Sequence, residues 1–260
     1  METQDHWARI GQRMARMGPP QVPGADLARQ IAGLLGGCPG TTVLLGVTPA
    51  YADLGQRVLA FDTAPGMIAA VWPGDTERRQ AHVADWRNLP IPDAAARQAV
   101  GDGALNALPD RATLRAVLVE LRRVLVPGGR AAIRVFLRRD PAETLIQVLQ
   151  AADESRIASL NVLRWRIASA LAEAPGYEVA VRDILSAAAP LGDLGEFARG
   201  RAMDPGQAEH FLAYQDSPAR YVFPDRVALA ADAAKAGFAC NWIPTTGYPG
   251  AEDCPIALLS

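Results

Sequence analysis

The chain has 260 residues, of which 50% are hydrophobic and 21% charged, and its formal net charge is −2. This size and apolar content are sufficient for one large α/β domain. The near-neutral balance argues against a protein whose whole surface is basic and binds nucleic acid or an anionic membrane by charge.

Two helices are expected before the first strand. Residues 5–17 place Trp7, Ile10, Met14 and Met17 at near-helical spacing, ahead of a Gly-Pro-Pro sequence that ends the helix. A second helix at 25–35 is followed by two glycines. The runs at 41–45 and 57–61 are then continuously apolar, which suits strands buried on both faces of a parallel sheet. The next expected elements are a helix at 66–71, a strand at 80–84 and a weaker strand at 97–102.

The second half of the chain continues this alternation. Asp110 is placed to cap a helix through Leu125, and Pro127-Gly128-Gly129 separates that helix from a strand at 130–136. The sequence Asp140-Pro141-Ala142-Glu143 has the residues of a helix start. The later expected elements are helices at 141–153 and 156–173, a poorly periodic segment at 175–204, a short helix from 204, a helix at 225–236 and strands at 238–244 and 254–259.

Repeated β-α units predict an α/β fold with a Rossmann-like, doubly wound sheet in three α/β/α layers. The last two strands are joined without a helix, so we expect an antiparallel C-terminal pair on a mainly parallel sheet. The first two helices would form an N-terminal helical cap.

Chemistry-bearing residues gather where the expected strands end, which is where open parallel sheets bind ligands. Three of these ends carry a carboxylate: Asp62, Asp85 and Asp102. Asp62 is suited to two ribose hydroxyls, and Asp85 to an exocyclic amine. The alternative at each position is an aspartate that only caps the next turn.

Smaller and apolar residues flank these carboxylates. Gly46 and Thr48 follow the first strand, Met67 can pack on a flat base, and Trp86 offers a backbone donor and an aromatic wall. Gly103 follows Asp102 and would let a ligand approach the backbone closely.

Residues 40–140 resemble the class I S-adenosylmethionine-dependent methyltransferases. The best-matched pieces are FDTAPGM, which resembles the family's acidic second motif, and LRRVLVPGGR, which resembles the helix-to-PGG turn before its fifth strand. The segment FPDRVALAADAAKAGF and the two strands after it resemble the family's last helix and closing strand pair.

The resemblance implies S-adenosylmethionine as cofactor and assigns a role to each flanking residue. Asp62 would bind its ribose, Met67 would line the adenine, Asp85 would meet the adenine amine and Trp86 the ring edge. Asp102 and Gly103 would lie beside the methionine end.

The first glycine motif of the family is degenerate in this sequence. The usual G-x-G-x-G is replaced by Gly46-Val47-Thr48-Pro49-Ala50, where Pro49 removes a backbone donor. Thr48 can substitute with its hydroxyl or amide, and the short distance to the next strand predicts a stunted helix. The loop is either an unusual cofactor cradle or a sign that the fold serves as a binding or scaffold protein. A full dinucleotide fingerprint is also absent, which disfavours a nicotinamide oxidoreductase.

The acceptor side of the site is less defined, and no catalytic base is assigned. His210 could reach the mouth of the site, whereas His82 is better explained as structural. The N-terminal helix and the insert at 156–222 are expected to cover the cofactor. The aromatic candidates for an acceptor pocket, which could equally pack the insert onto the core, are Trp165, Tyr214, Tyr221 and Phe223.

These observations predict a single domain over residues 1–260. It comprises an N-terminal helical cap at 1–37, a cofactor-binding half at 40–140, the mostly helical insert at 156–222 and a closing helix and strand pair at 223–260. We expect a small-molecule substrate and no nucleic acid, membrane or metal, with a homodimer left open. Three widely spaced cysteines, no signal-like N-terminus and no run near the roughly 20 apolar residues of a membrane span favour a cytoplasmic location.

Overall fold

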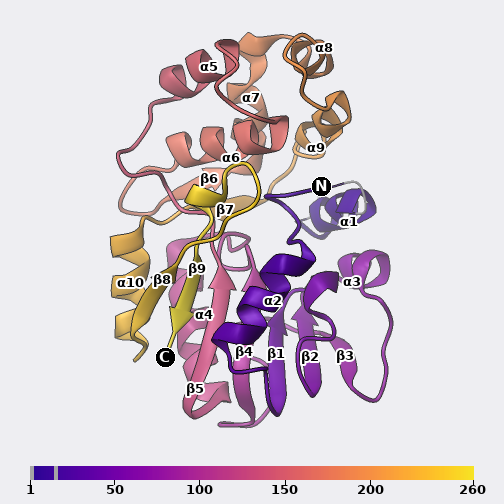
Figure 1. Ribbon diagram of the computed structural model, residues 1–260, viewed down its shortest axis with the longest axis vertical. Coiled ribbons are helices and arrows are strands. Elements are labelled where there is room, and N and C mark those ends of the chain that lie inside the picture. The colour runs from indigo at the N-terminus through magenta and orange to yellow at the C-terminus, as the bar shows by residue number, and fades with distance from the viewer. Residues whose placement is uncertain (1–2, 15–16) are drawn as a thin grey trace.

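The computed structural model describes residues 3–14 and 17–260. Its centre is a seven-stranded sheet in the order β3-β2-β1-β4-β5-β9-β8 (Figure 1). Strands β1 to β5 run parallel, β9 is antiparallel to β5, and β8 is antiparallel to β9. The strands are β1 (Thr41–Leu45), β2 (Arg57–Asp62), β3 (Arg79–Val83), β4 (Ala96–Asp102), β5 (Leu125–Arg134), β8 (Cys240–Ile243) and β9 (Ile256–Leu259). The predicted mainly parallel sheet with an antiparallel closing pair is confirmed.

Helices cover both faces of the sheet and give two apolar cores. One core includes residues of α2 and α3, and the other includes residues of α4 and α10. In α4, the stripe Leu114, Val117, Leu118 and Leu121 is fully buried, and the Asp110 side chain accepts the Thr113 N–H at 2.6 Å. The helices of this part are α1 (Thr3–Arg13), α2 (Ala25–Leu34), α3 (Pro65–Val71), α4 (Arg111–Val124) and α10 (Arg226–Lys235), with a 3₁₀ turn at Pro49–Tyr51.

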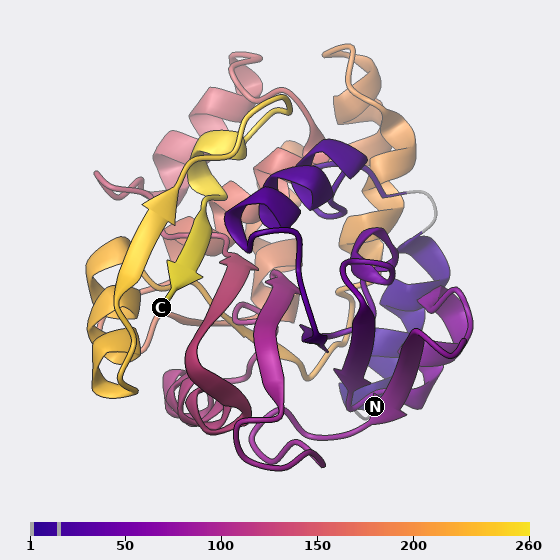
Figure 2. The same cartoon turned by 60° about the horizontal axis from the view of Figure 1, so that its bottom comes forward.

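A mostly helical cap lies beyond the carboxyl ends of the strands, and α1 lies beside α3 (Figures 1 and 2). The cap contains its own two-stranded antiparallel sheet of β6 and β7. Its elements are α5 (Leu145–Asp153), α6 (Leu160–Leu171), β6 (Glu178–Ala180), α7 (Val181–Ala187), α8 (Leu194–Arg199), α9 (Ala208–Leu212) and β7 (Arg220–Val222), with 3₁₀ turns at Ala189–Leu191 and Pro205–Gln207. A last 3₁₀ turn, Ala251–Asp253, precedes β9. None of the described helices is long and apolar enough to cross a membrane.

The start predicted for α5 at residue 141 is wrong. The helix begins at Leu145, because Thr144 and Gln147 form a reciprocal capping box four residues later than the predicted one. Glu143 pairs instead with Arg139 and Arg166. The carboxylate therefore ties the start of the cap to α6 and does not cap α5.

The segment 175–204, whose sequence is poorly periodic, contains β6, α7 and α8. Strand β5 begins at Leu125, five residues earlier than predicted, and its pairing with β4 shifts register between Ala96 and Gln98 to accommodate the PGG sequence. The helix predicted over 5–17 is α1, which ends at Arg13, and positions 15 and 16 lie outside the described residues.

Candidate functional site

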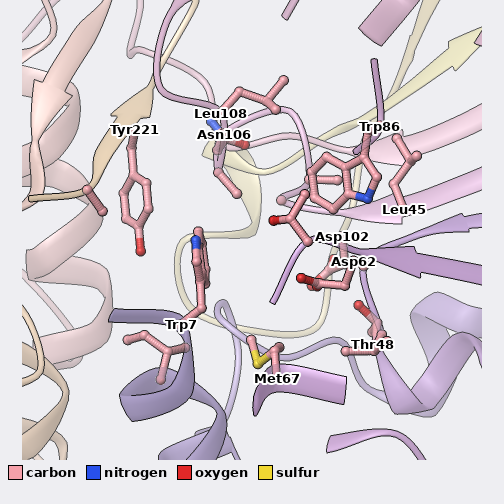
Figure 3. Close-up of a pocket in the computed structure, with 18 of the residues that line it drawn as sticks. Trp7, Leu45, Thr48, Asp62, Met67, Trp86, Asp102, Asn106, Leu108 and Tyr221 are labelled. Atoms are coloured by element: carbon pink, nitrogen blue, oxygen red, sulfur yellow. The ribbon is translucent and has the colours of Figure 1, made fainter. Parts of the chain in front are cut away.

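A cavity of about 450 Å³ opens between the carboxyl ends of the strands, α1 and the cap. Every residue that the sequence predicts as cofactor-binding lines it: Gly46, Thr48, Asp62, Met67, Asp85, Trp86, Asp102 and Gly103. They meet because parallel strands end at the same edge of the sheet. Figure 3 shows Asp62, Thr48 and Trp86 on one side of the cavity, and Trp7 and Tyr221 on the other.

Asp62 ends β2 with one carboxylate oxygen held by the backbone. Its Oδ1 accepts the Ala64 N–H at 2.8 Å. Its Oδ2 lies toward Gly46, so that a Cβ added to that glycine would be 3.9 Å away. Burial raises the pKa of Asp62 to about 6, against the opposing backbone hydrogen bonds from Ala64 and Thr63. This carboxylate is therefore poised to accept hydrogen bonds from a ligand in the cavity.

The first loop is compact. Gly46 has φ +87° and donates its N–H to the Phe61 carbonyl at 2.8 Å, which bridges the ends of β1 and β2. Thr48 is buried against the cavity, and only the three-residue turn Pro49–Tyr51 follows it. The predicted stunted helix is confirmed. Without a side chain at Gly46, the space between Asp62 and Trp86 stays open.

Gly46→Ala is expected to lower the free energy of unfolding by about 1–2 kcal/mol, because an L-residue is strained at positive φ. Gly33→Ala is the matched control, since Gly33 lies exposed in α2 with nothing within 4 Å of the added Cβ. That control should be neutral or gain up to about 1 kcal/mol. Equilibrium urea unfolding measures both, and equal effects of the two substitutions would contradict the strain.

Asp85 and Trp86 form the outer wall beyond β3. The Trp86 indole N–H donates to the Phe61 carbonyl at 2.5 Å, which fixes the ring beside the end of β2. The Asp85 carboxylate is bound by Arg87 at 2.5 Å, with both side chains about half exposed. The Arg87 hydrogen bond holds the pKa of Asp85 below its usual value. Asp85 is thus a charged acceptor at the mouth of the cavity.

Asp102 is bound by a residue that the sequence analysis did not single out. Both of its oxygens accept from Arg134, at the end of β5, with Nε–Oδ1 at 2.5 Å and Nη2–Oδ2 at 2.9 Å. The two side chains are 5% and 0% exposed. Burial raises the pKa of Asp102. Burial also opposes the charged form of Arg134, but the nearby Asp102 charge outweighs this effect and the pKa of Arg134 is raised. Asp102 faces the cavity as half of an ion pair and not as a free carboxylate.

The opposite wall comes from α1 and the cap. Gly11 lets α1 approach α3 closely, because a Cβ there would meet the Met67 sulfur at 3.0 Å. The residues that α1 and the segment after it place on the wall are Trp7, Ile10, Met14 and Met17. Of the predicted aromatic residues, Trp165, Tyr214 and Tyr221 line the cavity, whereas Phe223 does not. Residues of α1 and of the insert thus form the wall opposite the strand ends, and that they cover a bound cofactor stays a prediction.

Phe136 and Asn106 connect the two walls and were missed from sequence. Phe136 stacks on Trp165 with ring centroids 4.2 Å apart. The Asn106 amide donates to the Phe136 and Val222 carbonyls, each at 2.7 Å, and its oxygen accepts the Phe136 N–H. These contacts join the segment after β5 to β7, and both Asn106 and Phe136 line the cavity. An asparagine inside the GDGALNAL sequence is the signal that could have indicated them.

Neither of the considered histidines lines the cavity. His210 is buried in the cap, its Nδ1 is 2.9 Å from the Asn161 Oδ1, and burial lowers its pKa to about 4. The expectation that it reaches the mouth is therefore wrong. His82 is exposed on β3 and stacks on Phe61. Among the described cavity residues there is no histidine to act as a general base.

Comparisons with known proteins agree with this geometry. Residues 40–133 match a family model described as a methyltransferase domain. The glycopeptide N-methyltransferase MtfA is similar in structure, with 14% identity, 95% of each chain covered and a TM-score of 0.52. The DhpI–SAM–HEP complex has 16% identity, 99% and 96% coverage of this chain and that chain, and a TM-score of 0.54. The protein therefore has the class I methyltransferase fold, and its residues 40–133 match the methyltransferase-domain model.

A third similar structure carries a different description. It is a protein from Rhodobacter sphaeroides assigned to the Zn-dependent alcohol dehydrogenases, with 15% identity, 99% and 97% coverage and a TM-score of 0.60. At such identities, structural similarity shows the fold alone. In the described part of this chain, no group of three His, Cys, Asp or Glu side chains is placed to hold a metal ion. No curated protein matches the sequence.

Proposed function

We propose that this protein is an S-adenosylmethionine-dependent methyltransferase. The observation that carries the proposal is the pair formed by Asp62 and Gly46. One carboxylate oxygen is held by Ala64, the other lies next to a glycine that leaves the strand end open, and both residues fall inside the methyltransferase-domain match. A carboxylate so placed suits the two hydroxyls of a ribose. The DhpI complexes with SAM and with SAH support the same cofactor for this fold.

The other predicted residues fit the cofactor in chain order. Met67 would pack on the adenine, with Asp85 and Trp86 at its edge. Gly46, Thr48 and Gly103 would surround the methionine end, where the paired Asp102 keeps negative charge near a sulfonium. The cavity of about 450 Å³ lies within the usual range for small-molecule sites.

When bound, the cofactor supplies an electrophilic methyl group on a sulfonium. That group would pass to a lone pair of the acceptor, with the electrons of the carbon–sulfur bond left on sulfur. The chain's contribution is positioning: α1, Trp165 and Tyr214 enclose the acceptor, exclude water and align it with the strand ends. This enclosure favours a small-molecule acceptor.

We also infer that the protein works in the cytoplasm. Cys38, Cys240 and Cys254 are free thiols, and Cys38 and Cys254 are buried. Free thiols are typical of a reducing compartment. A homodimer stays an alternative to a monomer, and sizing by analytical ultracentrifugation would distinguish them.

Calorimetry with S-adenosylmethionine and S-adenosylhomocysteine tests the activity class. We expect both to bind with dissociation constants between about 1 μM and 1 mM, the usual range for enzyme substrates. If neither binds at millimolar concentration, the chain is a scaffold with a methyltransferase fold. Binding of NADH in their place, seen by fluorescence titration, would indicate a nicotinamide oxidoreductase.

A further inference from the structure

The cap places one buried cation in the cavity wall. Arg164 on α6 is only 2% exposed and lines the cavity. Its Nη1 donates to the His210 carbonyl at 2.9 Å, and its buried Nε has no hydrogen-bond partner. Within the described chain, no carboxylate forms an ion pair with it, so its charge is balanced by no acid there.

The other buried arginines among the described residues are paired. Arg134 is bound by Asp102, and Arg166 by Glu143. Burying a charge without a partner is costly, and a buried arginine is normally compensated by an acid. The charge of Arg164 is only partly compensated, by cation–π contacts. Its guanidinium carbon lies 4.9 Å from the centroid of the Tyr214 ring and 5.7 Å from that of the Trp165 ring.

The surroundings of Arg164 offer no negative charge from the cavity wall. The acidic residues among the described lining are Asp62, Asp85 and Asp102, all at the strand ends opposite the cap. Near Arg164, His6 bonds the Tyr221 hydroxyl at 3.0 Å. Burial, with the charges of Arg9 and Arg164, lowers the pKa of His6 to about 4, so this histidine is neutral. The cavity therefore has its carboxylates at the sheet end, where Asp85 and Asp102 are paired with arginines, and the cation Arg164 without an acidic partner at the cap end.

We propose that Arg164 binds an anionic group, a carboxylate or a phosphate, on the methyl acceptor. The inference rests on the proposed function and names the class of its substrate: a small molecule with one anionic group and an apolar, ring-like body. The anion would complete the hydrogen bonds of the Arg164 fork. The body would pack against Trp165 and Tyr214. This arrangement also sets a negative acceptor opposite a positively charged cofactor, which favours their alignment.

Three ring compounds of similar size test the recognition directly. Benzoate, phenyl phosphate and neutral benzamide are titrated into the protein saturated with S-adenosylhomocysteine, by calorimetry and by tryptophan fluorescence from Trp7 and Trp165. We expect at least one anion to bind tenfold or more tightly than benzamide, as for hydrogen bonds to a charged group. Comparison of the two anions then identifies the class. Equal binding of all three would overturn the proposal.

Variants of Arg164 test whether this residue causes the preference for an anion over benzamide. Arg164→Gln should remove the preference for the anion, leave benzamide binding unchanged and keep the affinity for S-adenosylhomocysteine within twofold. Arg164→Lys keeps the charge without the fork and should retain part of the preference. Arg199→Gln is the control, because Arg199 is an exposed cap residue paired with Glu196, and it should match the wild type.

The outcomes separate this inference from the proposed function. If Arg164→Gln instead weakens S-adenosylhomocysteine tenfold, Arg164 binds the cofactor's own carboxylate and the inference is wrong. Should that variant fail to fold in thermal melting, the wild-type preference and the Arg164→Lys result still decide. Cofactor binding without an anion preference overturns only the inference. In the cofactor-free protein, an anion preference without any cofactor binding overturns the proposed function, and Arg164 is then an anion site that serves no methyl acceptor.

Discussion

Arg134→Met is expected to lower the free energy of unfolding by about 3–5 kcal/mol, because it leaves the Asp102 carboxylate buried and unpaired. Arg134 also donates to the Pro20 carbonyl at 2.5 Å and to the Tyr248 hydroxyl at 3.0 Å. One side chain thus joins the ends of β4 and β5 to the N-terminal segment and to the loop before β9. Urea unfolding followed by circular dichroism measures the loss.

Two matched changes test the reason for this loss. Arg199→Met removes an exposed ion pair with Glu196 and should cost less than about 1 kcal/mol. Replacing both partners, as Asp102→Leu with Arg134→Met, removes the stranded charge and should be less destabilising than Arg134→Met alone. A single-variant loss under about 1 kcal/mol, or a double variant that is worse, would contradict a buried, mutually dependent pair.

The fold could be predicted because its central signals are local. Strands β1 and β2 are buried on both faces, so each appears in the sequence as an unbroken apolar run. Helix α4 has a side-chain cap at Asp110 and a buried stripe at helical spacing. The predicted cofactor residues meet in one cavity for an equally simple reason, since each lies at or shortly after the carboxyl end of a parallel strand.

The cap could not be predicted in the same way. Strands β6 and β7 have three residues each, and α8 has six. These segments are too short for the strand or the helix periodicity of apolar residues to be recognised. The β6–β7 pairing joins Glu178 to Val222, far apart in the chain. Short elements of this kind are stabilised by contacts with distant segments and not by their own sequence pattern.

The unpredicted part of the site has the same origin. Arg134 lies in an apolar strand sequence, and only the structure shows that it forms an ion pair with Asp102 on the neighbouring strand. Arg164 lies beside Trp165 in α6, and the sequence around it does not indicate that it lines a cavity. Its position in the wall of a cavity, without an acidic partner among the described residues, depends on the whole cap. Charges that act across the fold carry no local signal.

Asp62→Ala is expected to weaken the binding of S-adenosylhomocysteine by about 1.5–3 kcal/mol, the range for hydrogen bonds to a charged group. This corresponds to a loss of roughly 10- to 150-fold in affinity. Asp62 is the described strand-end carboxylate without an arginine partner, whereas Asp85 and Asp102 are bound by Arg87 and Arg134. Calorimetry at pH 8 measures the loss, and an unchanged affinity would place the ribose elsewhere.

The pH dependence gives an independent test of the same carboxylate. The pKa of Asp62 is raised to about 6 in the free protein, and hydrogen bonds from a ribose would lower it in the complex. The affinity should therefore be constant above about pH 6 and fall as the pH drops through that value, by at most about tenfold per unit. Asp62→Asn keeps the shape of the side chain but does not titrate. Its affinity for S-adenosylhomocysteine should therefore be weaker, and it should not change between pH 5 and pH 8, a range that extends about one to two units to either side of the Asp62 pKa. A fall of equal size in Asp62→Asn would assign the titration to another group and remove Asp62 from the ribose site.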